Sequence, residues 1–124
     1  IMMWYYTNTY RSTVKADDDN TFWTFEGDFN GDNPNIQINL GATLILVILG
    51  NGSGTHPFYI KTQLTSGNSD TVTGIVGNRA SNGKITWTPE TAGTYYYICD
   101  NHSNMNGTIT VLQWKNIRVY IMLK

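Results

Sequence analysis

Four residues with side chains that bind soft metal ions are grouped in this sequence. Cys99, His102 and Met105 follow one another with C-x-x-H-x-x-M spacing, and His56 lies upstream at another strand boundary. A thiolate, two imidazoles and a thioether favour copper over magnesium, calcium or manganese. Two histidines and a cysteine in a trigonal plane, with a weak axial methionine, form a type 1 copper site. The sequence therefore predicts a single copper ion held by His56, Cys99, His102 and Met105.

Cys99 also allows two other interpretations. As the only cysteine it excludes an intrachain disulfide and the structural zinc sites that need at least two thiolates. A lone cysteine is usually a small buried hydrophobe. A catalytic thiol paired with a histidine base would need a third orienting group and an oxyanion loop, and neither is evident in the sequence. Three strong ligands and a weak one leave no open position for a substrate, so we expect no enzymatic activity.

The composition predicts that strands position these side chains. Charged residues make up 14% of the 124 residues, while Thr, Asn and Gly are abundant, as is typical of short strands and tight turns. No segment keeps a 3.6-residue period, so any helix is short and is expected within 63–82. About eight short strands at the spacing of a β-sandwich are predicted, over 22–26, 36–39, 43–49, 58–62, 71–76, 84–88, 93–99 and 107–112.

The two ends of the chain differ from this pattern. We expect an N-terminal arm over 1–20, one domain over 21–112 and a C-terminal strand or arm over 113–124. The segment from Met2 to Tyr10 is aromatic and compatible with a strand, and residues 117–124 alternate as a strand does. Such ends, at 1–16 and 113–124, suit strand addition to a neighbouring subunit.

Charge and hydropathy exclude several classes of partner and site. A formal net charge of −1 gives no long-range field for nucleic acid, and the longest apolar run, Leu44 to Leu49, is strand-sized, so no membrane span is predicted. The first six residues lack the basic region and cleavage site of a secretory signal. Asp28 to Asp32 faintly suggests a calcium loop, but Asn39 stands at the twelfth position, so a turn is favoured.

Several segments resemble the cupredoxin superfamily, which includes plastocyanin and azurin. They are His56–Thr62, Gly83–Trp87, Ala92–Cys99 and Gly107–Val111, and the short ligand loop is similar to the amicyanin type. The resemblance covers about residues 21–112 and implies an all-β Greek-key sandwich with one type 1 copper ion. It implies a one-electron carrier with a redox protein partner, in the periplasm or secreted. Copper storage or delivery is disfavoured, because chaperones generally need ligands that exchange easily.

The same His-Pro-Phe and ligand-loop pattern also resembles cupredoxin-like modules in virion proteins of marine phages. This resemblance implies an alternative, a structural or interaction module that binds neighbouring subunits of a larger assembly such as a virion. Copper would then serve mainly to fasten the loops. The two arms are the part of the sequence on which this alternative depends.

Two residues depart from the plastocyanin pattern. Pro57 stands where plastocyanins carry an asparagine whose backbone N–H donates to the cysteine sulfur, and proline has no such group. A sulfur with fewer hydrogen bonds stabilises Cu(II), so we predict a lower reduction potential than in a site with that bond. Ile98 replaces an exposed tyrosine that plastocyanins use for electron transfer, so transfer is expected through the edge of His102 instead.

Overall fold

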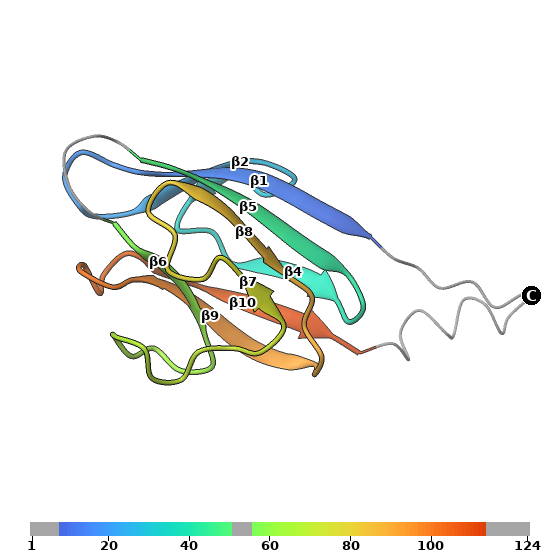
Figure 1. Ribbon diagram of the computed structural model, residues 1–124. Helices are drawn as coiled ribbons and strands as arrows, with labels where there is room; N and C mark the ends of the chain where they lie inside the picture. The colour runs from blue at the N-terminus through green and yellow to red at the C-terminus, as the bar shows by residue number, and fades with distance from the viewer. Residues whose placement is uncertain (1–7, 51–55, 114–124) are drawn as a thin grey trace, which may run out of the picture.

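The computed structural model describes residues 8–50 and 56–113, which form two β-sheets packed face to face (Figure 1). The six-stranded sheet has the order β3-β2-β1-β5-β8-β7, with β1 (Thr9–Ala16), β2 (Trp23–Gly27), β3 (Gly31–Asp32), β5 (Thr43–Leu49), β7 (Ile75–Val76) and β8 (Gly83–Trp87). The four-stranded sheet has the order β4-β10-β9-β6, with β4 (Ile36–Asn39), β6 (Phe58–Lys61), β9 (Gly93–Cys99) and β10 (Asn106–Leu112). The predicted all-β sandwich is confirmed.

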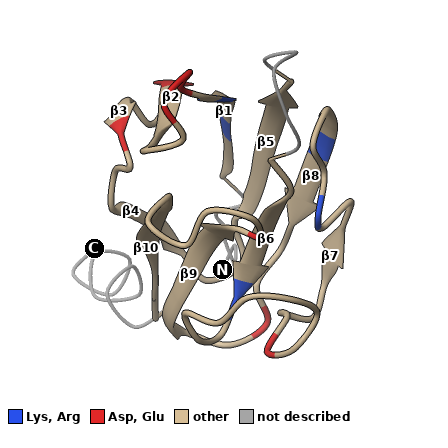
Figure 2. Cartoon of the chain, turned by 90° about the vertical axis from the view of Figure 1, so that its left-hand side faces the viewer, with Lys and Arg blue, Asp and Glu red and all other residues tan. Residues whose placement is uncertain are grey.

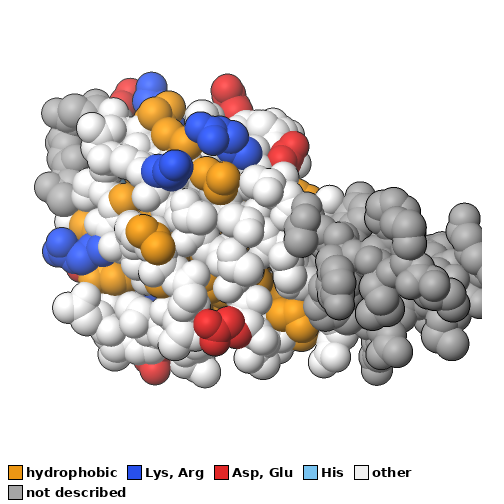
Figure 3. Space-filling model, turned by 45° about the vertical axis from the view of Figure 1, so that its right-hand side comes forward, with side chains coloured by type: hydrophobic (Ala, Val, Ile, Leu, Met, Phe, Trp, Pro, Cys, Tyr) orange, Lys and Arg blue, Asp and Glu red, His pale blue; other side chains and the backbone are white. Residues whose placement is uncertain are grey.

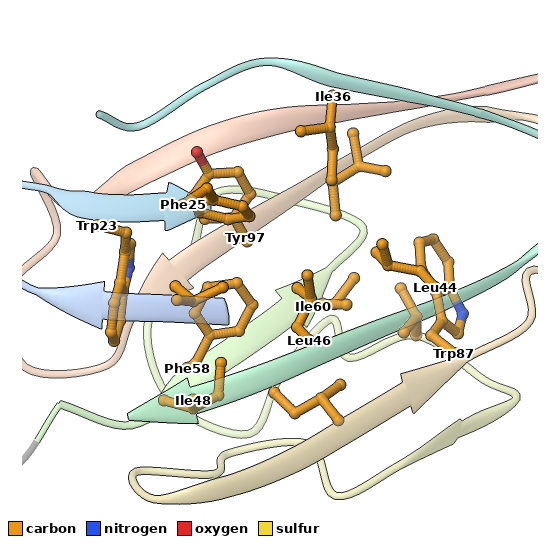
Figure 4. Packing of buried hydrophobic residues seen from close by; sticks show 14 of the residues in the cluster. Trp23, Phe25, Ile36, Leu44, Leu46, Ile48, Phe58, Ile60, Trp87 and Tyr97 are labelled. Atoms are coloured by element: carbon orange, nitrogen blue, oxygen red, sulfur yellow. The ribbon is translucent and has the colours of Figure 1, made fainter. Parts of the chain in front are cut away.

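The core lies between the two sheets and follows from alternation along the strands. In β5, Leu44, Leu46 and Ile48 are buried, while the residues between them are only half-buried on the outer face. Strands with this period of two place one apolar row against the opposite sheet. Figure 4 shows that row meeting Phe58 and Ile60 of β6 from the other sheet. Sheet packing therefore fixes the strands that lead to the ends of the sandwich.

β1 lies within the sandwich, although the sequence assigned its residues to an arm. It pairs antiparallel with β2, where Ala16 faces Trp23, and parallel with β5, where Thr9 faces Thr43. Val14 and Ala16 are buried in the core. Thr9–Ala16 is thus part of a sheet, whereas 1–7 and 114–124 lie outside the described residues, as does the predicted strand at 117–124. The predicted domain boundaries stay predictions.

The region expected to contain any short helix, 63–82, has none. It consists of turns, the two-residue strand β7 and single bridges that pair Lys61 with Thr71 and Phe58 with Ala80. Gly67, Gly74 and Gly77 have positive φ angles, which a helix does not accommodate. The predicted strand at 71–76 is correspondingly shortened to β7. The described residues include no helix long and apolar enough to cross a membrane.

The segment after β6 covers the outer face of that strand, so all four residues of β6 are buried. The ammonium group of Lys61 donates hydrogen bonds to the carbonyls of Thr65 and Gly67, and the hydroxyl of Tyr59 donates to Asn68. Burial lowers the pKa of Lys61, while Asp70 and Asp100 act to raise it. β6 is therefore held on both faces, and the residues at its start are firmly positioned.

The surface outside these strands is largely polar. Figure 3 shows small, separated apolar groups between polar and basic side chains on the face that it displays. The large apolar side chains that are exposed among the described residues are those of Leu49, Leu64 and Val76. Single exposed apolar side chains of this kind are normal on a protein surface.

Candidate metal centre

His56, Cys99 and His102 meet at one end of the sandwich, the end that faces the viewer in Figure 2. The Nδ1 atoms of His56 and His102 lie 3.6 Å and 3.7 Å from the Sγ atom of Cys99. The three ligand atoms lie within 4.8 Å of one another. Metal bonds of about 2.0 Å to nitrogen and about 2.3 Å to sulfur, at about 120°, separate those atoms by about 3.7 Å. The arrangement therefore fits one metal ion between the three residues.

Strand pairing brings the first two of these residues together. Cys99 is the last residue of β9 and faces Phe58 of β6, so His56, two residues earlier, reaches the same end. The backbone N–H of Asp100 donates to the carbonyl of Pro57 at 3.0 Å, which continues the pairing by one step. Both side chains thus depend on a single antiparallel pair of strands.

A tight return loop brings the other two predicted ligands to this end. The backbone N–H of Cys99 donates to the carbonyl of Met105, and that of Met105 donates to the carbonyl of His102, both at 3.0 Å. Met105, three residues after His102, is completely buried, whereas His102 is only partly buried. The structure therefore brings all four predicted residues to one end of the molecule.

Aromatic side chains form the inner wall of the site. The ring of Trp23, from the start of β2, lies edge-on to the ring of His56 with 6.1 Å between centroids, and it also packs against Phe58. The rings of His56 and His102 have centroids 4.9 Å apart. His56 is only 5% exposed, so one imidazole faces the core and the other reaches the surface.

The electrostatics of the site suit metal binding better than nucleophilic catalysis. Burial lowers the pKa of His56, and the nearby His102 lowers it further, which favours the neutral imidazole that a metal requires. Burial raises the pKa of the Cys99 thiol, and Asp100 adds to that effect. A reactive thiol needs a lowered pKa and an exposed position, and Cys99 has neither. A metal cation would displace the proton directly on binding.

The cysteine sulfur also has hydrogen-bond donors that the sequence analysis did not identify. The backbone N–H groups of Asn101 and His102 act on Cys99 and lower its pKa, against the larger effect of burial. The return loop therefore supplies two hydrogen-bond donors to the sulfur, although Pro57 can supply none. The loop conformation, and not a residue type, supplies them, so the sequence carried no signal for them.

Two asparagines near the site were missed as well. Asn104, between two predicted ligands, donates from Nδ2 to the carbonyl of Asn20 at 3.1 Å, and Asn33 forms reciprocal hydrogen bonds with the backbone of Trp23. The turn preference of asparagine was the only sequence signal at either position.

Comparison with known proteins identifies the family through structure. No protein-family model matches the sequence, and no curated protein matches it either. Reduced rusticyanin matches with a TM-score of 0.60 and 30% identity, over 86% of this chain and 81% of that one. Rusticyanin from Thiobacillus ferrooxidans matches with a TM-score of 0.60 and 28% identity, over 86% and 79%. The chain belongs to the cupredoxin family.

Membership of the cupredoxin family confirms the resemblance inferred from the strand and ligand-loop segments. A third rusticyanin structure, described as that of a copper protein, matches with 27% identity and a TM-score of 0.60, over 86% of this chain and 80% of that one. The His-Cys-His cluster of this cupredoxin has the donor types and spacing of a type 1 copper site.

Proposed function

We propose that this cupredoxin binds one type 1 copper ion and carries single electrons. The ligands are Nδ1 of His56, Sγ of Cys99, Nδ1 of His102 and the thioether of Met105. The observation that carries the proposal is the convergence of three ligand atoms within 4.8 Å at the end of a rigid strand pair. Copper, when bound, supplies the exchange between Cu(I) and Cu(II).

The chain's own residues account for the other properties of a carrier. His56 and Cys99 are held by β6 and β9, so their positions need to change little between the two oxidation states. Trp23 and Phe58 exclude water from the inner side of the site. His102 is partly exposed, so its ring edge is where electrons pass to a redox protein partner. The site offers no open position to a substrate, and the proposal includes no catalysis.

An electrochemical measurement tests the carrier role. The copper-loaded protein should undergo one-electron reduction and re-oxidation through repeated cycles without losing its metal. Ser103→Ala, an exposed change in the same loop, should cycle as the parent does. Copper that is bound but cannot be reduced and re-oxidised reversibly would remove the carrier role and leave only metal binding. We expect a carrier of this kind to work outside the cytoplasm, as in the periplasm.

Met105→Leu tests the fourth ligand. Leucine keeps the volume of the buried side chain and removes the sulfur. The intense thiolate-to-copper absorption should remain, because Cys99 is intact, while the reduction potential should rise, because a donor that stabilises Cu(II) is lost. A potential and spectrum identical to those of the parent would show that Met105 is a core residue and no ligand.

The alternative role, a structural module that binds neighbouring subunits of a larger assembly such as a virion, depends on the chain ends. The informative deletion covers 1–7 and 114–124 but spares β1, because β1 lies between β2 and β5. A truncated protein that keeps copper, redox cycling and its oligomeric state supports the carrier. Loss of an assembly, with the copper site intact, supports the module.

A further inference from the structure

One polar side chain links the ligand loop to a distant segment of the other sheet. Asn104 lies between His102 and Met105, and its Nδ2 donates to the carbonyls of Asn20 at 3.1 Å and Thr21 at 3.4 Å. These carbonyls belong to the connection that leads into β2. Asn20 has a positive φ of 59°, a backbone conformation that turns this connection sharply before β2 begins.

A second asparagine connects the same loop to the wall behind His56. The Oδ1 atom of Asn33 accepts from the backbone N–H of Trp23 at 2.8 Å, and the N–H of Asn33 donates to the carbonyl of Trp23 at 2.8 Å. Nδ2 of Asn33 also approaches the backbone carbonyl of Asn104 at 3.5 Å. The Trp23 ring in turn packs against the ring of His56. The two asparagines thus join the ligand loop and the His56 wall through one short segment.

We propose that Asn104, assisted by Asn33, is a positioning residue that holds the loop of His102 and Met105 in its metal-binding conformation before the metal arrives. The inference rests on the proposed function, since it concerns how that site is prepared. Apart from this link, the loop is held by β9, β10, its own turn hydrogen bonds and the hydrogen bonds of Asp100 with Pro57 and Gly67, all of which belong to the four-stranded sheet or the segment after β6. A loop held from a second sheet loses less freedom when it binds a metal, which increases affinity.

Amide hydrogen exchange of the metal-free protein tests the first half of the proposal. In Asn104→Ala, the amides of Cys99 and Met105, which are hydrogen-bonded within the loop, should exchange about fivefold faster, the effect of one net hydrogen bond. Amides of β5 and β8 should not change. Asn104→Asp has the same size but turns an acceptor toward two carbonyls, so it should behave as Asn104→Ala does. Ser103→Ala is the matched control and should resemble the parent.

Copper binding by the same variants tests the second half. Asn104→Ala should bind copper about fivefold more weakly, with a shifted thiolate-to-copper band, while Ser103→Ala shows neither change. Unchanged exchange in Asn104→Ala, or faster exchange with parental affinity and spectrum, would overturn the positioning role while the parent still binds copper. A parent that binds no copper would remove the proposed function and this inference together, so the two failures are distinguishable.

Discussion

At the scale of single residues, the sulfur of Cys99 is the atom on which the site depends. It is buried, which raises the pKa of the thiol, and it accepts hydrogen bonds from the backbone N–H groups of Asn101 and His102, which lower that pKa. Pro57, directly after His56, has no N–H to add. Each donor to the sulfur withdraws charge from it and destabilises Cu(II) relative to Cu(I). The number of donors should therefore set the reduction potential.

Pro57→Ala provides a test of this dependence, because alanine supplies the backbone N–H that proline lacks directly after His56. We expect the reduction potential of the copper-loaded protein to rise by about 50 mV, which corresponds to about 1 kcal/mol for one additional hydrogen bond. Protein-film voltammetry measures the shift. Pro89→Ala, a change at a second buried proline that follows β8, is the control and should leave the potential unchanged. A potential equal to or below that of the parent would contradict the expectation.

Residue types and spacing suggested Cys99, His102 and Met105 as one ligand set, because a strand end and the tight loop after it are local in sequence. His56 lies 43 positions before Cys99, and the pairing of β6 with β9 brings the two together. Asn104 could not be predicted in the same way. Its side-chain amide donates to the backbone carbonyl of Asn20, 84 positions away, and only the packing of the two sheets brings these residues together. The sequence shows such an asparagine as a turn residue and nothing more.

At the scale of elements, β9 and β10 approach closely at one point in the core. Tyr97 is completely buried, its ring stacks on Phe58 with 5.3 Å between centroids, and its hydroxyl donates to the carbonyl of Pro34 at 2.6 Å. Gly107 of β10 lies directly opposite Tyr97 in the sheet register. The absence of a side chain at Gly107 therefore makes room for the ring that supports the strand of Cys99.

Gly107→Ala should destabilise the protein by about 3 kcal/mol, because overpacking of a fixed core ring forces the strands apart. A Cβ at this position would lie 2.2 Å from the hydroxyl oxygen of Tyr97 and 2.4 Å from its Cζ. Urea unfolding of the metal-free protein measures the loss. Gly50→Ala, whose Cβ would have only ordinary contacts of 3.5 Å, is the matched control. Equal stability of the two variants would show that Tyr97 can move.

Tyr97→Phe should change how stability depends on pH. Burial raises the pKa of Tyr97 in the folded protein well above its usual value near 10, so its protonated form is the stable one there. Its contribution is complete below about pH 10 and is lost as pH rises further, because the unfolded chain alone then ionises. The parent should be more stable than Tyr97→Phe by about 1 kcal/mol near pH 8, through the bond to Pro34.

Above about pH 10 this advantage should shrink by about 1.4 kcal/mol per pH unit. Urea unfolding at both ends of the range measures the difference. Tyr96→Phe, on the opposite face of β9, is the control and should follow the parent. A difference between the parent and Tyr97→Phe that is the same at both ends would mean that the Tyr97 phenol ionises as readily when folded.

At the scale of the whole molecule, the sequence predicted the sandwich because alternation and turn residues are strong along most of its strands. β5 and β9 have the bounds that the sequence indicates, since turn residues flank β5 and Gly93 opens β9. The residues of β1 were assigned to the N-terminal arm because their apolar alternation is weak. The buried Ser12 of β1 interrupts the apolar row, and its hydroxyl is satisfied by reciprocal hydrogen bonds with the backbone of Phe29, 17 residues away.

The two sheets position a metal site that neither could form alone. The four-stranded sheet carries His56 and Cys99 through β6 and β9, while the six-stranded sheet supplies Trp23 at the inner wall and the connection that Asn104 contacts. The chain belongs to a family in which such a sandwich is the scaffold, with 30% identity to reduced rusticyanin over most of its length. The central claim is therefore that this end of the sandwich binds one copper ion through Cys99 and both histidines.

Titration of the purified metal-free protein with Cu(II), followed by visible absorption, tests that claim most directly. We predict an intense thiolate-to-copper band that grows until one equivalent has been added and then stops, and that is absent in Cys99→Ala under the same conditions. Ser103→Ala should reproduce the parental titration. A parent without the band, or a Cys99→Ala variant that retains it, would contradict the account.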